Sequence, residues 1–331
     1  MFFDFITIGG ATEDITFYTD EGILTDNKSD VLRQKLLSFE YGAKIEINKA
    51  YSTYGGGAAN AAVCLARLGY KTACLAAIGD DFRGKSLMAN FKNNGVMTNL
   101  LKKIKGEKTG YSFFLVGRDN EHICFSDRAA NQKLKIEIRD VKILKQAREI
   151  YLTSLSGDWR GVLNKIFSSR RTGITWNPGQ LQLKSGFSII GKFFKYCQSL
   201  IVNQDEAIEL VISDKKYRRQ DRGFLNNIRN LLAIIKKWGP QIVIITASKR
   251  GADAYDGVKF YHHEIVKEKR FINTTGVGDA FGSTFTAGLE MFKGDIKKAM
   301  QLGVTNTASV VANMGAQAGL LTKKEIFRTF H

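Results

Sequence analysis

Short apolar runs and amphipathic segments alternate along the chain. The runs are β-branched and almost continuously hydrophobic, as in strands that are covered on both faces; they span residues 2–9, 71–79, 149–155, 173–176, 199–203 and 241–246. Apolar residues recur at helical spacing over residues 57–68, 84–93, 137–147, 159–169, 205–211 and 223–238. This alternation predicts an α/β fold, with a mostly parallel sheet and helices on both of its faces. After Asp279 the pattern is mostly helical to the end.

Two insertions depart from this alternation. Residues 14–54 hold strand-like runs at 15–19 and 44–48, joined by a long polar segment. Residues 107–128 have the pattern of a hairpin, with two apolar runs on either side of a turn at 117–120. We expect the two insertions to join into one small sheet over the site.

No internal repeat and no Pro- or Ser-rich linker divides the chain. We therefore predict a single domain over residues 1–331, with lid insertions at about 14–54 and 107–128. Of the 331 residues, 44% are hydrophobic, which is enough for a large core without disulfides or structural metal. The four cysteines lie far apart without a CxxC pair, so buried reduced thiols are expected.

The amino-terminal stretch has no basic segment, and no apolar run approaches ~20 residues, so neither a signal peptide nor a membrane span is expected. These features predict a cytoplasmic protein. The net charge of +17 could attract nucleic acid, membrane or anionic substrates. The densest basic run, 215–219, lies in a loop pattern, and no nucleic-acid-binding signature accompanies it. We expect a solvated basic surface and no nucleic-acid partner.

One motif combines glycines with an acid at the start of a helix: Asn273-Thr-Thr-Gly276-Val-Gly278-Asp279. Glycines at a helix start let backbone amides converge on an anion, and the helix dipole adds positive potential. This arrangement suits a phosphoryl group whose charge grows during transfer. Asp279 could cap the helix, or it could take a proton from an attacking hydroxyl. The residues alone leave both interpretations open.

A second glycine motif, Gly55-Gly56-Gly57-Ala-Ala-Asn60, also precedes a helix. Three glycines let the backbone approach a ligand or another segment closely. The Asn60 amide could bridge substrate hydroxyls as donor and acceptor, or it could make a local turn bond.

A third stretch, Gly79-Asp80-Asp81-Phe-Arg-Gly84-Lys-Ser, satisfies the P-loop pattern GxxxxGK[ST]. Two carboxylates within a loop that cradles phosphates would repel them. We therefore expect no phosphate-binding role for this turn.

The two glycine motifs, in their order and spacing, resemble the two signatures of the ribokinase/PfkB carbohydrate kinase family. The turn at 78–84, Asn203-Gln-Asp-Glu206 and Thr246-Ala-Ser-Lys-Arg-Gly251 resemble further elements of this family, so the resemblance covers nearly the whole chain. It implies a ribokinase-like three-layer fold, with a central mostly parallel sheet and a small β-sheet lid. It also implies an ATP-dependent phosphotransferase with an alcohol acceptor.

The resemblance further implies roles for matching residues. Asp279 would be the catalytic base, and the amides of Gly276, Val277 and Gly278 would form the anion hole. The acceptor would face Asp14, Gly56, Gly57 and Asn60. ATP would lie against Asn203, Thr246, Ser248 and Gly251, with Asn306 bordering adenine. Asn203 and Glu206 would help to place Mg²⁺ through water.

Simpler interpretations stay open for two of these sets. Asn203 and Glu206 could form a helix cap with its box partner, and Asp14 could be a plain turn acid. Two departures from the family pattern also matter. Asn273 replaces the usual acid, which leaves dependence on a monovalent cation open, and Ser248 stands where glycine is common.

A ribose-like pentose is the favoured acceptor, because the Asp14, Gly-Gly and Asn60 set suits a small polyol. A nucleoside of the adenosine type is the alternative, since lid aromatics could stack on a base or form the lid core: Tyr18, Phe39, Tyr41 and Phe113. Fructose or a sugar phosphate comes third. A non-catalytic sugar- or nucleic-acid-binding regulator is the alternative of a different class, against which the intact Asp279 and its glycines argue. A homodimer through the lid, as in some family members, also stays open.

Overall fold

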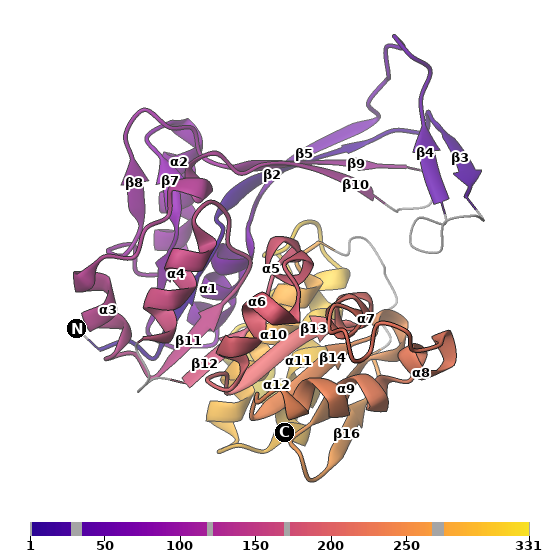
Figure 1. Ribbon diagram of the computed structural model, residues 1–331. Coiled ribbons are helices and arrows are strands. Elements are labelled where there is room, and N and C mark those ends of the chain that lie inside the picture. Colours follow the sequence, from indigo (N-terminus) through magenta and orange to yellow (C-terminus); the bar gives the residue numbers. More distant parts are fainter. Residues whose placement is uncertain (1, 28–34, 118–121, 169–172, 267–274, 331) are drawn as a thin grey trace.

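The computed structural model describes residues 2–27, 35–117, 122–168, 173–266 and 275–330 (Figure 1). Its centre is an eight-stranded sheet in which neighbouring strands from β6 to β14 are parallel, while β15 and β16 are antiparallel. In sheet order the strands are β16 (Phe260–His263), β15 (Ala252–Tyr255), β14 (Ile242–Thr246), β13 (Ser199–Asn203), β12 (Gly173–Trp176), β11 (Glu149–Leu152), β1 (Phe5–Ile8) and β6 (Thr72–Leu75).

Helices cover both faces of this sheet because its inner strands are apolar on both sides. Alternate side chains separate the two faces: Ile150 and Leu152 of β11 pack into one cluster, and Tyr151 packs into another. One face carries α1 (Gly57–Arg67), α2 (Phe82–Asn93), α10 (Val277–Met291), α11 (Ile296–Val311) and α12 (Lys323–Phe330). The other carries α3 (Ile138–Leu144), α4 (Trp159–Phe167), α5 (Gln180–Lys184), α6 (Phe187–Phe194), α7 (Gln204–Ile212), α8 (Arg222–Asn226) and α9 (Ile228–Lys237).

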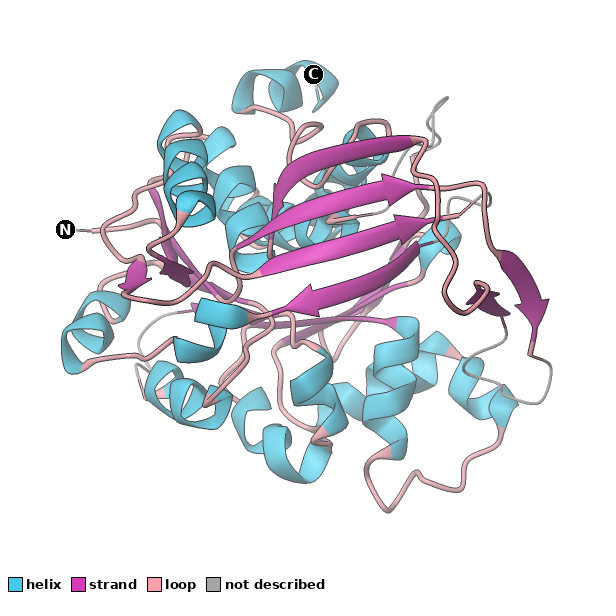
Figure 2. Cartoon of the chain, turned by 90° about the horizontal axis from the view of Figure 1, so that it is seen from above, coloured by secondary structure: helices cyan, strands magenta, loops and turns pink. Residues whose placement is uncertain are grey.

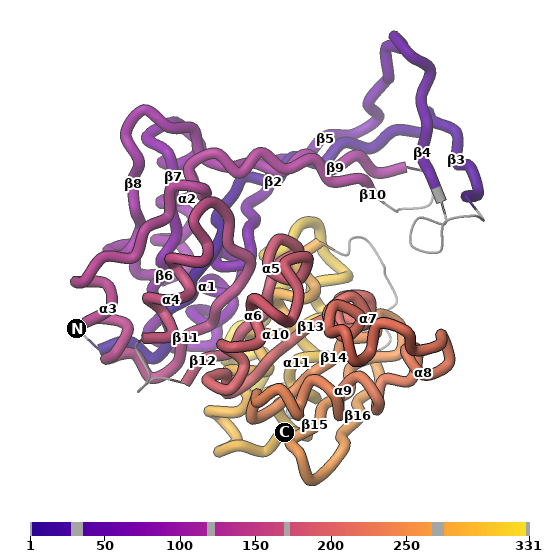
Figure 3. The backbone as a smooth tube through the Cα atoms, viewed as in Figure 1, coloured from indigo at the N-terminus to yellow at the C-terminus, as the bar shows by residue number. Residues whose placement is uncertain are grey.

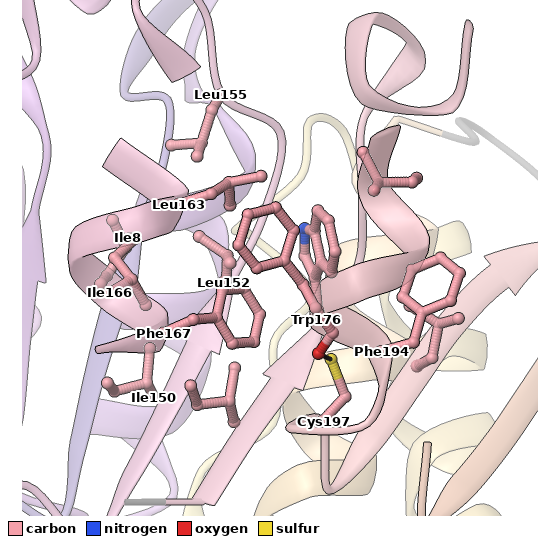
Figure 4. Packing of buried hydrophobic residues seen from close by; sticks show 14 of the residues in the cluster. Ile8, Ile150, Leu152, Leu155, Leu163, Ile166, Phe167, Trp176, Phe194 and Cys197 are labelled. Carbon is pink, nitrogen blue, oxygen red and sulfur yellow. Dashed lines mark hydrogen bonds between the residues drawn. The ribbon is translucent and has the colours of Figure 1, made fainter. Parts of the chain in front are cut away.

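The core of the second face is built around Trp176 on β12, which is fully buried. Its ring centroid lies 5.7 Å from that of Phe167 on α4 and 5.8 Å from that of Phe194 on α6. Figure 4 shows these rings beside Cys197, whose thiol is buried as expected. Cys64 and Cys74 are buried as well, but Cys124 is exposed because it lies on an edge strand of a second sheet.

The second sheet joins the two insertions, as predicted. Its order is β10 (His122–Asp127), β9 (Tyr111–Val116), β2 (Thr12–Tyr18) and β5 (Lys49–Gly55), with β2 parallel to β9 and the other pairs antiparallel. The strand expected at 44–48 is instead β5, and most of the predicted turn at 117–120 lies outside the described residues. The sheet runs across the top of Figure 1 above α5, and from above it covers the middle of the molecule (Figure 2).

Other local predictions were wrong in detail. The run 71–79 divides between β6 and β7 (Ala77–Gly79), which pairs with β8 (Lys102–Ile104), and α5 and α6 were not predicted. The helix expected over 223–238 breaks at Asn227, whose Oδ1 accepts from the Arg229 amide at 3.0 Å and caps α9. Beyond the second sheet, β3 (Ile23–Asp26) and β4 (Lys35–Ser38) form a hairpin.

The chain ends lie on the body, away from the second sheet (Figure 3). The basic run 215–219 lies in turns between α7 and α8, as predicted. None of the helices in the described ranges combines the length and the apolar character that crossing a membrane requires.

Candidate active site

A cavity of about 210 Å³ lies at the carboxyl ends of β1 and β11, under the second sheet. In open α/β folds this edge is where ligands bind. Its walls come from five places: the turns after β1 and β11, the strands of the second sheet, the segment after β10, the start of α1 and the start of α10. Among the lining residues are Gly9, Gly10, Asp14, Gly56, Gly57, Asn60, Ser112, Arg128, Asn131, Ser154, Gly276 and Asp279.

Asp279 is half-buried in the first turn of α10 and reaches this cavity. Its Oδ2 accepts a hydrogen bond from Asn60 Nδ2 at 2.9 Å, and the N-cap of α10 is Gly276, without a side-chain cap bond. The interpretation of Asp279 as a helix cap is therefore wrong. Burial raises the pKa of the Asp279 carboxyl, and the hydrogen bond from Asn60 partly opposes this rise.

Gly276 adopts a left-handed conformation, with φ of 76°. A Cβ at this position would lie 2.3 Å from the Ala316 Cβ, so only glycine fits. At Gly278 a Cβ would meet nothing within 4 Å, so space lies in front of the helix end. The amides of the first turn have no partner within the helix. An anion could therefore approach them.

Asp14 on β2 is buried, with only 5% of its surface exposed. Burial raises its pKa to about 6, the hydrogen bonds with Thr12 and Ser112 lower it, and the charge of Asp279 raises it further. A Cβ on Gly55 would lie 1.8 Å from Asp14 Oδ2, so this glycine makes room for the carboxylate. Asp14 is therefore a buried acid within the cavity wall, in contrast to the alternative of a plain turn acid.

Asn60 is also buried, and its bonds are long-range. Besides donating to Asp279, it accepts a hydrogen bond from Gln317 Nε2 at 3.0 Å, 257 residues further along the chain. The alternative of a local turn bond is therefore wrong. A Cβ on Gly57 would lie 3.1 Å from Asp279 Oδ1, so this glycine lets α1 start close to α10.

The residues expected around ATP gather at a neighbouring part of the same sheet edge. Asn203 ends β13, Thr246 ends β14, and the two are paired in register. Ser248 has φ of 45° and Gly251 has φ of 87°, so a left-handed serine stands where the family commonly has glycine. Of the described residues that line the cavity, none comes from this group.

Asn203 and Glu206 form the capping box of α7. Asn203 Oδ1 accepts from the Glu206 amide at 2.9 Å, and Glu206 Oε2 accepts from the Asn203 amide at 2.8 Å. Burial raises the pKa of Glu206. The box leaves Glu206 Oε1 outside these two bonds, so the cap does not exclude a water-mediated contact with a metal ion.

Asn306 differs from its predicted position. It is fully buried on α11, where Nδ2 donates to Thr284 Oγ1 at 2.7 Å and Oδ1 accepts from the Leu321 amide at 2.9 Å. Both ends of the amide are thus used inside the helical layer. The residue joins α10, α11 and the following segment, and it is too deeply buried to border adenine.

Sequence reasoning missed several cavity residues, because no motif marks them. Arg128 follows β10 and is the one lysine or arginine among the described lining residues. Asn131 bonds the backbone of Ala11 through both ends of its amide, at 3.1 and 3.0 Å. The only signal was their place just after the predicted hairpin.

The P-loop interpretation is excluded by the turn at 79–84. Asp81 Oδ1 accepts from the Gly84 amide at 2.9 Å and caps α2, and its other oxygen accepts from the Thr109 amide at 3.0 Å. Asp80 accepts from the Gly106 amide at 3.2 Å. The Asp81 carboxylate therefore occupies the Gly84 amide, which a phosphate in a P-loop would need, and both acids are used in local contacts of the turn.

Asn273, on which the question of a monovalent cation turns, lies outside the described residues. Within the described part of the chain, no group of three or more His, Cys, Asp or Glu side chains could hold a metal ion.

The chain matches known proteins along most of its length. A family model described as pfkB family carbohydrate kinase matches residues 29–323. A ribokinase of Haemophilus influenzae is 26% identical over 277 residues, which are 82% of this chain and 85% of that protein. An ATP-dependent ribose-1-phosphate kinase of Halopiger xanaduensis is 22% identical over 264 residues, 80% of this chain and 82% of that protein. The structure of Arabidopsis thaliana ribokinase complexed with ribose and ATP superposes with a TM-score of 0.78 at 18% identity, covering 99% and 98% of the two chains.

Proposed function

The chain belongs to the pfkB family of carbohydrate kinases, phosphotransferases with an alcohol acceptor, and we propose that it transfers the γ-phosphoryl group of ATP to a ribose-like pentose. One observation carries the proposal. The carboxyl of Asp279 and the glycine-bounded start of α10 face the same cavity, which also holds the buried acid Asp14. A proton acceptor, an anion site and a hydroxyl-binding carboxylate are thus together.

In this proposal the acceptor hydroxyl lies between Asp14, Asn60 and Asp279. Its oxygen forms a bond to the γ-phosphorus while the bond to the leaving ADP oxygen breaks, and Asp279 takes the hydroxyl proton. The amides of Val277 and Gly278, at the end of the α10 dipole, stabilise the charge on the phosphoryl oxygens.

ATP would extend from α10 toward Thr246, Ser248 and Gly251 at the ends of β14 and η2 (Ser248–Arg250). Mg²⁺, when bound, would offset the charge of the terminal phosphates. Asn203 and Glu206 would hold it through water, since the capping box leaves Glu206 Oε1 outside its two bonds.

The size of the cavity supports a single sugar ring. About 210 Å³ lies below the roughly 300–1,000 Å³ of pockets for drug-sized ligands. Two of the four lid aromatics considered for stacking on a nucleoside base pack against other rings, Phe113 against Phe17 at 4.7 Å between centroids and Tyr18 against Tyr51 at 5.9 Å, although Tyr111 and Phe114 line the cavity. Tyr41 is fully exposed.

A phosphorylated sugar is a second candidate, favoured by Arg128. This arginine is the one cationic side chain among the described lining residues, which include three acids. Arginine binds phosphate groups with paired hydrogen bonds. The similarity to a protein named ribose-1-phosphate kinase points in the same direction.

We also propose that the second sheet acts as a lid that excludes water from the transfer. The β3–β4 hairpin beyond this sheet and the edge strand β10 expose apolar side chains that a second copy of the chain could cover: Ile23, Leu24, Leu36 and Phe125. Light scattering should then give the mass of a homodimer. A monomer at working concentrations would remove this part of the proposal.

The test is ADP release from MgATP over a panel of pentoses, hexoses, sugar phosphates and nucleosides. Turnover on one acceptor should fall at least ~10²-fold in Asp279→Asn, since this is the minimum contribution typical of a general base. Asp295→Asn is the matched control, because Asp295 caps α11 and asparagine caps equally well. Near-normal turnover of Asp279→Asn would refute the base assignment. Silence of the folded protein on the whole panel would favour a non-catalytic sugar-binding regulator.

A further inference from the structure

Asp279 is the end of a series of hydrogen-bonded amide side chains that leads away from the cavity. Asn60 Nδ2 donates to Asp279 Oδ2 at 2.9 Å, and Gln317 Nε2 donates to Asn60 Oδ1 at 3.0 Å. Asn90 Nδ2 in turn donates to Gln317 Oε1 at 2.9 Å. Three amide side chains from three separate segments are thus linked to the carboxylate by consecutive hydrogen bonds.

The chain of bonds continues to a cation. Asn94 Nδ2 donates to Asn90 Oδ1 at 3.1 Å, and Arg67 Nε donates to Asn94 Oδ1 at 2.9 Å. Arg67 Nη1 also donates to the backbone oxygen of Gln317 at 2.9 Å. Arg67 therefore binds both Asn94, at the end of this series of hydrogen bonds, and the backbone of Gln317, in its middle.

The two ends determine the orientation of every amide between them. A guanidinium can only donate hydrogen bonds, and an ionised carboxylate can only accept them. Starting from Asp279, Asn60 must present its NH₂ to the carboxylate and its oxygen to Gln317. Starting from Arg67, Asn94 must present its oxygen to the guanidinium and its NH₂ to Asn90. The two assignments meet without conflict at Gln317.

We propose that Gln317 is a positioning residue, which holds the Asn60 amide with its NH₂ toward Asp279 and leaves Asp279 Oδ1 free for the acceptor hydroxyl. The inference rests on the proposed function, in which Asp279 is the base. Without the donor at position 317, Asn60 could turn and present its oxygen to the carboxylate. The two oxygens would then repel each other, and Asp279 would lose its orientation.

The segment that carries Gln317 supports this role. Gln317 is 8% exposed and lies in the turn after α11. Its neighbour Ala316 packs on Gly276, where a Cβ would lie 2.3 Å away. Two residues earlier, Gly315 lies against Thr53 of β5. The same turn therefore contacts the start of α10, the second sheet and Asn60.

The main variant is Gln317→Leu, which removes the donor and keeps the size. We expect kcat/KM for the acceptor to fall about tenfold to a hundredfold, as for the loss of one hydrogen bond to a charged group, with KM for ATP unchanged. The acid limb of the pH profile should move to higher pH, since the bond from Asn60 lowers the pKa of Asp279. Asp14, Asp127, Arg128 and Tyr151 also lie near Asp279, but the variant leaves them in place.

A second readout needs no acceptor. The ¹³C signal of the Asp279 carboxyl, assigned by its absence in Asp279→Asn, should titrate at higher pH in Gln317→Leu than in the parent protein. Should this variant fail to fold, Asn90→Leu removes the donor to Gln317 without touching Asn60, and it should shift the titration in the same direction by less. Asn230→Leu is the control. It removes an amide side chain that donates to the Phe224 backbone oxygen at 3.1 Å and takes no part in the hydrogen bonds between Arg67 and Asp279.

The outcomes separate the inference from the function. An active Asp279→Asn would overturn the part of the proposed function on which the inference rests, the role of Asp279 as base. An inactive Asp279→Asn, together with parent-like pH profile and carboxyl titration in Gln317→Leu, would overturn the role of Gln317 alone. A lower melting temperature in Gln317→Leu without any shift would also mean that the residue is only structural.

Discussion

In the proposed function, Asp14 should make acceptor binding depend on pH within an accessible range. Burial raises its pKa to about 6. The ionised carboxylate accepts hydrogen bonds from sugar hydroxyls with both oxygens, and more strongly than the protonated acid does. With a pKa of about 6, roughly nine-tenths of Asp14 is ionised at pH 7 and roughly one-tenth at pH 5. The affinity for the acceptor should therefore fall about tenfold from pH 7 to pH 5.

Calorimetric titration with the acceptor, in the absence of ATP, measures this affinity without the chemical step. Asp14→Asn is the matched variant: the amide fits beside Gly55, and its oxygen can still accept from Thr12 Oγ1, 2.9 Å away in the parent. It cannot ionise, so its affinity should be weaker at pH 7 and should change less toward pH 5. Asp279 titrates in both proteins, so the difference between the two curves reports on Asp14.

Two results would refute this reasoning. Parent affinity that stays constant between pH 5 and pH 7 would mean that Asp14 does not bind the acceptor as a carboxylate. An equal decline in Asp14→Asn would assign the pH dependence to another group.

Three further variants test other parts of the structure. Glu149 is buried, and burial raises its pKa to about 8. As pH rises from the ordinary pKa of a glutamate toward 8, the folded state therefore loses stability by up to roughly 1.4 kcal/mol per pH unit. Glu149→Gln should raise the melting temperature more at pH 8 than at pH 5. Equal effects at both pH values would contradict the buried acid. In Gly276→Ala, at φ of 76°, the new methyl group would press against Ala316, and kcat should fall about hundredfold. The control Gly294→Ala, at φ of 90° with nothing within 4 Å of the new methyl group, should retain kcat. Equal kcat in both variants would exclude the anion-site role. Asp81→Ala removes the N-cap of α2 and should lower the free energy of unfolding by about 1 kcal/mol or more with KM for ATP unchanged. A lowered KM for ATP, as expected when an acid that repels phosphate is removed, would restore the P-loop interpretation.

The layered architecture followed from the sequence because its cause is local. The runs that became β1 and β11 are apolar at every position or nearly so, and both strands are buried throughout. Short runs of this kind are typical of strands with both faces covered. The same reasoning failed over 223–238, where one polar residue, Asn227, caps a new helix instead of continuing the old one.

The sequence also determined the parts of the site that depend on a few adjacent residues. The glycines before Asn60 and Asp279 mark the starts of α1 and α10, and the capping box of Asn203 and Glu206 spans three residues. Conformational freedom and capping act over one helical turn, so they can be recognised in the chain itself.

Only the tertiary structure decided which side chains meet across the chain. Asn60 contacts Asp279 and Gln317, Arg128 lines the cavity without any motif, and Asn306 is an internal link between helices. These relations depend on how the second sheet and the helices pack on the large sheet. Such contacts join residues that are far apart in the sequence, and each is selected by the fit of whole elements, which no local pattern encodes.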